Sequence, residues 1–332
     1  MNDQGLKHDV MEVPVEHSEK SLKVVSSAVD SQRLIDIFLS NKSPQTIAAY
    51  RKDLKDFARF LGVEDGNIDE VARLFLSNGR GSANSFSAEY RTHLEERGLS
   101  PATINRRLSA LRALVEQAGT LGLVSWELKI KGVKSTAYKD TEGPGTFKVR
   151  EMLSLLESRK EKSDKKGGTI KVPRIVRDYA IVRLLYDIAL RRGEVVSLDL
   201  EDVDLERCSL RVMGKGQSEK QILDLPEPTV EALQEWIDVR GDKTGALFTK
   251  GKGKRLTGTA VWYIIRNIGE EVGVTTRPHG LRHSSITACV EQFPLTDIQQ
   301  FSRHKKIETV AVYADRKKKI QKKIATFVSA TA

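Results

Sequence analysis

The sequence predicts a mainly α-helical protein of two domains, with one small antiparallel β-sheet. Its length of 332 residues is typical of about two domains. Apolar residues recur every three or four positions through most of the chain, which is the period of an amphipathic helix. Two short segments, 208–213 and 221–225, have strand character, and the glycine-containing loop between them is typical of a β-hairpin.

The first domain is predicted to consist of helices alone. Residues 1–28 show neither a helical nor a strand period, and we expect a flexible tail there. Residues 29–128 follow as a small helical domain, in which 84–97 is one predicted helix. Two further helices have a strong start signal, a serine N-cap followed by proline, at Ser43-Pro44 and Ser100-Pro101.

Residues 129–146 are predicted to be a linker, because they contain several glycines and lack an apolar period. The remaining residues, 147–332, form the second predicted domain. An apolar helix starts there at Val172-Pro173, and the hairpin follows it. The last predicted helix of the chain has an apolar stripe made of Ile320, Ile324, Phe327 and Val328.

The formal net charge of +10 is concentrated in two segments. Residues 129–150 contain six basic and two acidic residues, and residues 301–332 contain nine basic and two acidic ones. Residues 1–30 are acidic instead. Basic clusters of this kind indicate a polyanionic partner, and a solvated surface face is the alternative interpretation.

Several classes of protein are excluded by the sequence. No run approaches about 18 apolar residues, so we expect neither a transmembrane helix nor a membrane partner. The polar N-terminus lacks the apolar core of a secretory signal. Cys208 and Cys289 are too few and too far apart for a disulfide framework, so a cytoplasmic protein is expected. Because P-loop, HExxH and clustered-carboxylate motifs are absent, we expect no metal and no other cofactor.

Basic, imidazole and phenol side chains of the second domain form the candidate site. Its members are Arg191, Lys215, His279, Arg282, His304 and Tyr313, with Glu194 three residues after the first arginine. His279 and Arg282 share a face if they lie on one helix. His304 and Tyr313 fall on opposite sides of a continuous helix, so they converge only if the helix breaks between them. Single matches of this kind are weak, but the ordered set is specific.

This ordered set resembles the tyrosine recombinases, also called the phage integrase family. The matching segments are ALRRGEVVSLDLEDVDL (189–205), VMGKGQ (212–217), RPHGLRHS (277–284) and FSRHKKIETVAVY (301–313). The resemblance covers about residues 31–320, and implies a SAM-like helical core-binding domain followed by a mixed α/β catalytic domain. Two pairs depart from the family pattern: Ile188-Ala189 stands where Thr-Gly is usual, and Ser302-Arg303 where Leu-Gly is common. Both departures concern the local backbone and remove no reacting group.

The resemblance implies a role for each candidate in site-specific DNA recombination, with no need for a metal or ATP. Arg191 and Arg282 would clamp the scissile phosphate with planar guanidinium groups that stay charged. His279 and His304 would bond its oxygens or assist proton transfer. Tyr313 would be the nucleophile, and its attack would form a covalent 3′-phosphotyrosyl intermediate.

Three further roles follow from the same resemblance. Lys215, in the hairpin loop, would protonate the leaving 5′ oxygen, and Lys220 and Lys252 are the alternative lysines. Glu194 would orient the first arginine. His283 is interpreted as a structural residue.

DNA contacts outside this set are predicted for two groups of cations. Arg106, Arg107 and Arg112 are expected on the polar face of one helix of the first domain, and a solvated face is the alternative. Lys131 and Lys134 lie in the basic linker, which we expect along the phosphate backbone.

The expected partners are double-stranded DNA recombination sites and other copies of the chain. The family pattern implies a homotetramer on two paired sites, in a cytoplasmic, nucleoid-associated location. The C-terminal helix would be exchanged between protomers, and the alternative is that it folds onto its own domain.

Two other functions stay open: a type IB topoisomerase-like enzyme and a DNA-binding protein without catalysis. The pattern is shared by recombinases of phages, transposons, integrons and chromosome resolution.

Overall fold

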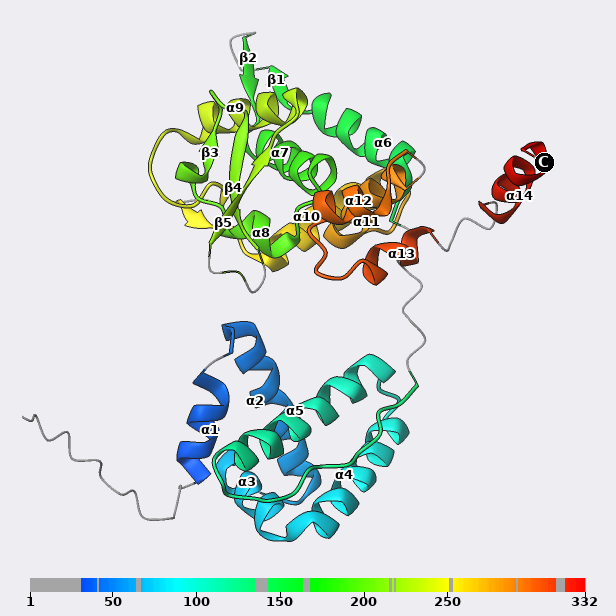
Figure 1. The fold of residues 1–332 in the computed structure, drawn as a ribbon. Coiled ribbons are helices and arrows are strands. Elements are labelled where there is room, and N and C mark those ends of the chain that lie inside the picture. The colour runs from blue at the N-terminus through cyan, green and yellow to red at the C-terminus, as the bar shows by residue number, and fades with distance from the viewer. Residues whose placement is uncertain are drawn as a thin grey trace, which may run out of the picture. The chain divides into compact units, whose positions relative to one another are not determined.

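The chain divides into two compact units, residues 1–136 and 137–332 (Figure 1). The computed structural model describes residues 31–40, 42–63, 67–134, 143–163, 168–214, 217, 219–250, 253–290, 292–314 and 320–331. The boundary between the units falls inside the segment 129–146, for which the composition predicts a linker. The tail predicted at 1–28 and the predicted general acid Lys215 lie outside the described residues.

Helices make up the described secondary structure of the first unit. They are α1 (Ser31–Ser40), α2 (Pro44–Phe60), α3 (Ile68–Ser77), α4 (Gly79–Glu96) and α5 (Pro101–Thr120). The serine–proline signals mark the starts of α2 and α5. The Ser43 hydroxyl accepts a hydrogen bond from the Thr46 N–H, and the Ser100 hydroxyl from that of Thr103, both at 3.3 Å.

The first six residues of the predicted linker pack onto the first unit. The side chain of Asn105 pairs with the backbone of Val133 at 2.8 and 2.9 Å, and Asn84 accepts from the Lys129 N–H at 2.8 Å. Ile130 and Val133 pack against the apolar core of this unit. Amide side chains thus satisfy an extended backbone that lacks a strand partner.

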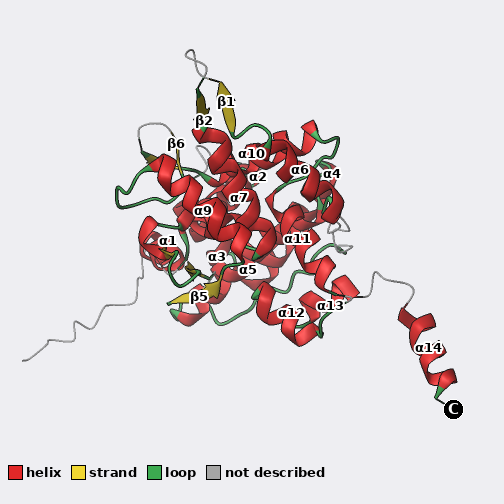
Figure 2. Cartoon of the chain, turned by 90° about the horizontal axis from the view of Figure 1, so that it is seen from above, coloured by secondary structure: helices red, strands yellow, loops and turns green. Residues whose placement is uncertain are grey.

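The second unit contains both helices and strands. Its elements are α6 (Gly145–Glu157), β1 (Glu161–Ser163), β2 (Thr169–Lys171), α7 (Pro173–Asp187), α8 (Arg192–Ser197), a 3₁₀ turn (Leu200–Asp202), β3 (Val203–Asp204), β4 (Ser209–Met213), β5 (Lys220–Asp224), α9 (Glu227–Arg240), β6 (Thr249–Lys250), β7 (Lys254–Arg255), α10 (Gly258–Glu271), α11 (Pro278–Cys289), α12 (Leu295–Ser302), α13 (Glu308–Ala314) and α14 (Ile320–Ala330). The prediction of a mainly helical chain with a small antiparallel sheet is confirmed, as the predominance of helix in Figure 2 shows.

Helix α7 lies at the centre of the second unit and packs against α6, α9 and α11 (Figure 2). Its buried residues include Tyr179, Ile181, Leu184 and Leu185. A helix that is apolar on most sides belongs in the interior, which explains the long apolar pattern after Val172.

The predicted hairpin is formed by β4 and β5, in a register that pairs Met213 with Lys220. Leu210 and Val212 are buried and Arg211 is exposed, as expected when one face of a sheet covers a core. Strand β3 extends this sheet to three strands. The β1–β2 and β6–β7 ribbons escape prediction because their strands are only two or three residues long and largely polar. In the described part of the chain, no helix is both long and apolar enough to span a membrane.

Candidate active site

Arg191 is positioned by the turn that joins α7 to α8. Ala189 in this turn has a left-handed backbone (φ 49°), and Arg191 is the N-cap of α8. The carboxylate of Glu194 accepts from the Arg191 N–H at 2.8 Å and from its Nη1 at 2.7 Å. Arg191 Nη2 donates to the carbonyl of Arg303 at 2.9 Å. Both edges of this guanidinium are therefore held, while about a third of the side chain (31%) stays exposed.

Arg282 extends from α11 into the interior and is 1% exposed. Its two terminal nitrogens donate to the carbonyls of Ala189 and Ser302, and its buried Nε has no hydrogen-bond partner. Burial and the nearby charges of Arg191 and Arg303 lower its pKa. The lowered pKa of about 9 is still above neutral pH, so the guanidinium keeps its charge at pH 7.

The helix break expected between His304 and Tyr313 is present, since α12 ends at Ser302 and α13 begins at Glu308. The Ser302 hydroxyl bonds His304 Nδ1 at 2.8 Å, and Gln299 Nε2 donates to the His304 carbonyl at 3.1 Å. The centroids of the His304 and Tyr313 rings are 6.4 Å apart. The break thus brings to one place two side chains that a continuous helix would separate.

Tyr313 is buried, with 5% of the residue exposed, and its hydroxyl is hydrogen-bonded to His283 Nδ1. His283 lies on α11, one turn after His279, and these two rings meet edge to face at 4.0 Å. The sequence predicts a structural role for His283 and did not indicate its hydrogen bond with Tyr313. The available signal was its position four residues after His279, on the same helical face.

The imidazoles of this site are poor bases because partial desolvation and neighbouring charged groups lower their pKa values. Burial, followed by Arg282, lowers the pKa of His279, and the same causes lower that of His304 to about 4. Burial, followed by His279, lowers the pKa of His283 to about 3. All three rings are therefore neutral at pH 7, and each offers one donor and one acceptor.

A pocket of about 490 Å³ opens beside the two predicted arginines. Its polar and aromatic lining residues are Arg191, Arg192, Trp262, Arg277, His279 and Arg282. Arg192, Trp262 and Arg277 were not singled out from the sequence. Four guanidinium groups around one opening form an environment suited to a phosphodiester anion.

Among the lysines, the structure describes Lys220 but neither Lys215 nor Lys252. Lys220 Nζ donates to the Asp202 carboxylate at 2.5 Å, and that carboxylate is 3% exposed. Lys220 is thus engaged in an ion pair next to the sheet.

The DNA-binding candidates of the first unit fall into different environments. Arg107 is 7% exposed, and its guanidinium bonds the Asp56 carboxylate. This burial is at odds with the predicted polar face, because α5 turns Arg107 toward α2. Arg106 bonds Asp53, and its side chain is 41% exposed. The remaining candidates are Arg112, which is half-buried, and Lys131 and Lys134, which are exposed.

Comparison with known proteins agrees with an enzyme acting on DNA phosphodiesters. Residues 151–319 match the phage integrase family, and residues 34–118 match the phage integrase N-terminal SAM-like domain. A tyrosine recombinase of Synechocystis sp. is 32% identical over 316 residues, covering 91% of this chain and 96% of that protein. A tyrosine recombinase of Synechococcus elongatus is 32% identical over 293 residues, covering 85% and 88%.

The chain belongs to the tyrosine recombinase, or phage integrase, family. It is a site-specific recombinase with an N-terminal SAM-like domain and a catalytic domain. Two solved structures share this fold at 18% identity. They are the Tn1549 transposon integrase with transposon right-end DNA (TM-score 0.65, covering 90% of this chain and 99% of that one) and the XerH recombinase in a post-cleavage complex with palindromic difH (TM-score 0.63, 91% and 86%).

Proposed function

We propose that Tyr313 is the nucleophile of this recombinase and that it forms a 3′-phosphotyrosyl bond with DNA. One observation carries the proposal: segments far apart in the sequence bring Arg191, His279 and Arg282 to one cation-lined pocket. Tyr313 lies next to this group, because its hydroxyl bonds His283, whose ring contacts that of His279. The DNA-bound XerH and Tn1549 integrase structures share the fold and support a double-stranded DNA substrate.

The two arginines stabilise charge on the scissile phosphate. Arg191 offers its exposed portion to the pocket, and Arg282 is held by two carbonyls that prevent it from turning away. A pentacoordinate transition state gains negative charge on its oxygens, so fixed cations stabilise it more than they stabilise the bound substrate. His279, which is exposed at the pocket, and His304 add hydrogen bonds to the same oxygens.

The reaction forms the bond from Tyr313 Oη to phosphorus and breaks the bond to the 5′ oxygen. The phenol proton passes to a neutral imidazole, and Lys215 supplies a proton to the leaving oxygen. Tyr313 must exchange its contact with His283 for the phosphate, because its hydroxyl is buried in the described structure. Religation reverses these steps: a 5′ hydroxyl attacks the phosphorus, the bond to Tyr313 Oη breaks and the tyrosine takes back its proton. The phosphodiester bond energy is conserved, so no external energy source is required.

A suicide substrate, in which the cleaved 5′ fragment diffuses away, tests this assignment. Wild-type protein should accumulate a covalent protein–DNA adduct, and Tyr313→Phe should form none while binding DNA with unchanged Kd. An adduct that persists in Tyr313→Phe would disprove the assignment, and no adduct in either protein would favour a binding protein without catalysis. Relaxation of supercoiled DNA regardless of sequence would favour the topoisomerase-like alternative.

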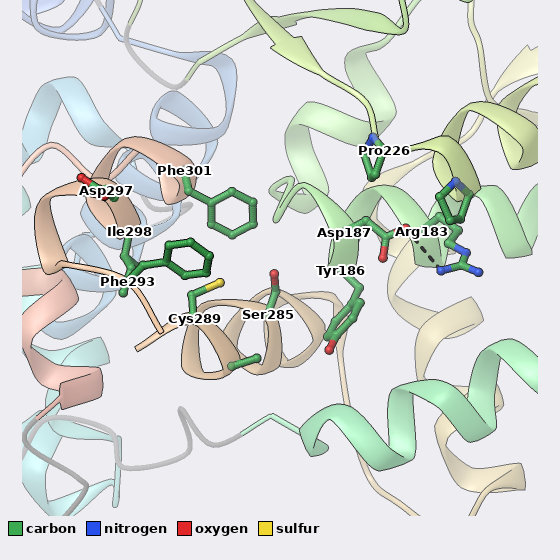
Figure 3. Close-up of a pocket in the computed structure, with 12 residues that line it drawn as sticks. Arg183, Tyr186, Asp187, Pro226, Ser285, Cys289, Phe293, Asp297, Ile298 and Phe301 are labelled. Atoms are coloured by element: carbon green, nitrogen blue, oxygen red, sulfur yellow. Dashed lines mark hydrogen bonds and ion pairs between the residues drawn. The ribbon is translucent and has the colours of Figure 1, made fainter. Parts of the chain in front are cut away.

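We further propose that the active form is a homotetramer in which α14 docks on a neighbouring copy. The support is complementary apolar surface. Phe327 and Val328 on α14 are 70% and 57% exposed. An apolar groove of about 580 Å³ lies between α7, α11 and α12, and Figure 3 shows Phe293 and Phe301 pointing into it opposite Tyr186.

The polar residues of the groove suit the same occupant. Asp297 at its rim is exposed, and the segment that contains α14 is rich in lysine, with Lys322 and Lys323 in its first turn. Opposite charges at the edge of an apolar contact favour one partner and one register.

Deleting residues 320–332 should abolish recombination of two sites while leaving suicide cleavage of a single site intact. Ala288→Trp, which fills the groove from α11, should have the same effect. A mixture of the deletion variant and Ala288→Trp tests α14 and the groove separately, because the deletion removes only α14 and Ala288→Trp fills only the groove. Intact recombination by the deletion variant would contradict helix exchange.

A further inference from the structure

Arg303 occupies a backbone conformation that usually belongs to glycine. It ends α12 with φ 54° and ψ 39°, in the left-handed region that a β-carbon disfavours. An arginine at such a position needs compensating contacts, and its side chain is only 8% exposed. The contacts of this side chain show what it stabilises.

The guanidinium of Arg303 spans from the α12–α13 loop to the turn that precedes Arg191. Its Nη1 donates to the carbonyls of Ile188 at 3.2 Å and Phe301 at 3.3 Å. Its Nη2 donates to the Ala189 carbonyl at 3.2 Å and to Glu194 Oε2 at 2.9 Å. The Arg303 side chain therefore bonds both Ala189, the other left-handed residue of the site, and the carboxylate of Glu194.

These contacts close a ring around Arg191. Arg303 Nη2 bonds Glu194 Oε2, Glu194 Oε1 bonds Arg191 Nη1 at 2.7 Å, and Arg191 Nη2 bonds the Arg303 carbonyl at 2.9 Å. Residue 303 thus contributes to both contacts that hold the Arg191 guanidinium. Its side chain fixes Glu194, and its backbone carbonyl accepts from Arg191 Nη2. A planar guanidinium held at two edges has one orientation.

Arg303 itself is not placed to bind substrate. Its terminal nitrogens are all engaged with protein acceptors, and its buried Nε has no hydrogen-bond partner. Arg303 is also absent from the residues that line the cation-rich pocket, whereas Arg191 is among them. Any effect of Arg303 on catalysis must therefore pass through the groups that it holds, which are Glu194 with Arg191 and the 188–189 turn, whose Ala189 carbonyl also bonds Arg282.

We propose that Arg303 is a positioning residue, which orients Arg191 toward the scissile phosphate by fixing Glu194 and the 188–189 turn. This inference rests on the proposed role of Arg191 in binding that phosphate. It also explains why the site tolerates residues other than glycine at two left-handed positions, 189 and 303: the side chain of Arg303 bonds the carbonyl of Ala189.

Single-turnover cleavage of a suicide substrate at saturating DNA tests the proposal. Arg303→Met should slow cleavage by about 100-fold, the order expected when a reacting group is slightly misplaced. The Kd for DNA should stay within about twofold of wild type at matched salt, since Arg303 does not line the pocket. Arg303→Lys keeps the charge and should recover part of the rate.

Arg303→Gly separates positioning from backbone strain. Glycine relieves the left-handed conformation, so this variant should melt at no lower temperature than Arg303→Met and still cleave slowly. Millimolar guanidinium ion, which can enter the space left by the side chain, should raise its rate. Arg207→Met and Cys208→Gly are matched controls, because Arg207 is 85% exposed and Cys208 has a left-handed backbone (φ 47°) in an exposed turn.

Coupling to Glu194 supplies the decisive measurement. Glu194→Gln and Arg303→Met should together cost less in rate than the product of their separate effects, because both act on Arg191. Wild-type cleavage by Arg303→Gly, or fully multiplicative effects in the double variant, would overturn the proposal. Failure of the proposed function would look different, since the wild-type protein would then form no adduct through Tyr313.

Discussion

The histidines of the site show how burial sets the chemistry of single residues. Burial, followed by the neighbouring His279, lowers the pKa of His283 to about 3, and burial, followed by Arg282, lowers that of His304 to about 4. A neutral ring can take the proton of Tyr313 or donate to a phosphate oxygen, whereas an imidazolium could only donate. Their environment thus keeps both rings neutral at pH 7, which suits them as hydrogen-bond partners of a phosphate oxygen, while the lowered pKa values make them weak proton acceptors.

The same pKa shifts make folding stability depend on pH. Between about pH 6.5 and pH 4, the unfolded chain binds a proton at His304 that the folded chain does not, because the ordinary pKa is about 6.5. We therefore expect the melting temperature to fall as the pH is lowered from 7 to 5. His304→Gln should show a smaller fall in differential scanning fluorimetry, and an unchanged fall would contradict the shift.

The residue types at the site could be predicted from sequence motifs, but their partners could not. Arg191, His279, Arg282, His304 and Tyr313 stand in recognisable order, and their spacing even required the helix break that is found. Nothing in the linear pattern showed that the residue after Arg282 bonds the tyrosine hydroxyl. That contact depends on how α13 packs against α11, and such packing joins residues far apart in the chain.

At the scale of elements, helix α5 carries arginines with different tasks. Arg107 and Asp56 form a buried pair to which Tyr90 also donates, with its hydroxyl 2.8 Å from the Asp56 carboxylate. Asp56 has a lowered pKa, since hydrogen bonds from Arg97 and Tyr90 and the charge of Arg107 outweigh its burial. This network joins α2, α4 and α5, so we assign Arg107 to the stability of the first unit.

Arg107→Met should destabilise the first unit by about 2 kcal/mol, because it removes a charged hydrogen bond to Asp56 while Arg97 and Tyr90 still hold that carboxylate. Urea denaturation followed by circular dichroism measures this loss. Arg51→Met, on the exposed face of α2, serves as the control and should change stability by less than about 0.5 kcal/mol. A loss of DNA affinity with unchanged stability in Arg107→Met would restore the groove-contact interpretation.

The helices and strands that could be predicted are those with strong local sequence signals. Capping by a serine before a proline predicts the starts of α2 and α5, and alternation of apolar and polar residues predicts the β4–β5 hairpin. Both signals are properties of neighbouring residues. The two small ribbons and the folding of residues 129–134 onto the first unit depend on distant partners, such as Asn105. Their sequences alone resemble ordinary loops.

At the scale of the whole molecule, the basic segments predict strong salt dependence of DNA binding. Lys131 and Lys134 are exposed on the segment that leaves the first unit. Replacing both with alanine should reduce the slope of log Kd against log salt by about 2, because each phosphate contact releases about one counterion. Titrations between 50 and 300 mM salt measure the slope, with Lys243→Ala on the exposed turn after α9 as control. An unchanged slope would remove these lysines from the DNA interface.

The sequence by itself determined the helical fold class, the order of the candidate site residues and the family, because all three are read from local patterns and spacing. The tertiary structure decided which groups hold those residues in place. Arg107 is part of a core network, His283 bonds the hydroxyl of Tyr313, the proposed nucleophile, and Arg303 closes a ring around Arg191 through Glu194. The physical reason is that hydrogen bonds to buried charges are set by long-range packing, which brings together residues as far apart as 194 and 303.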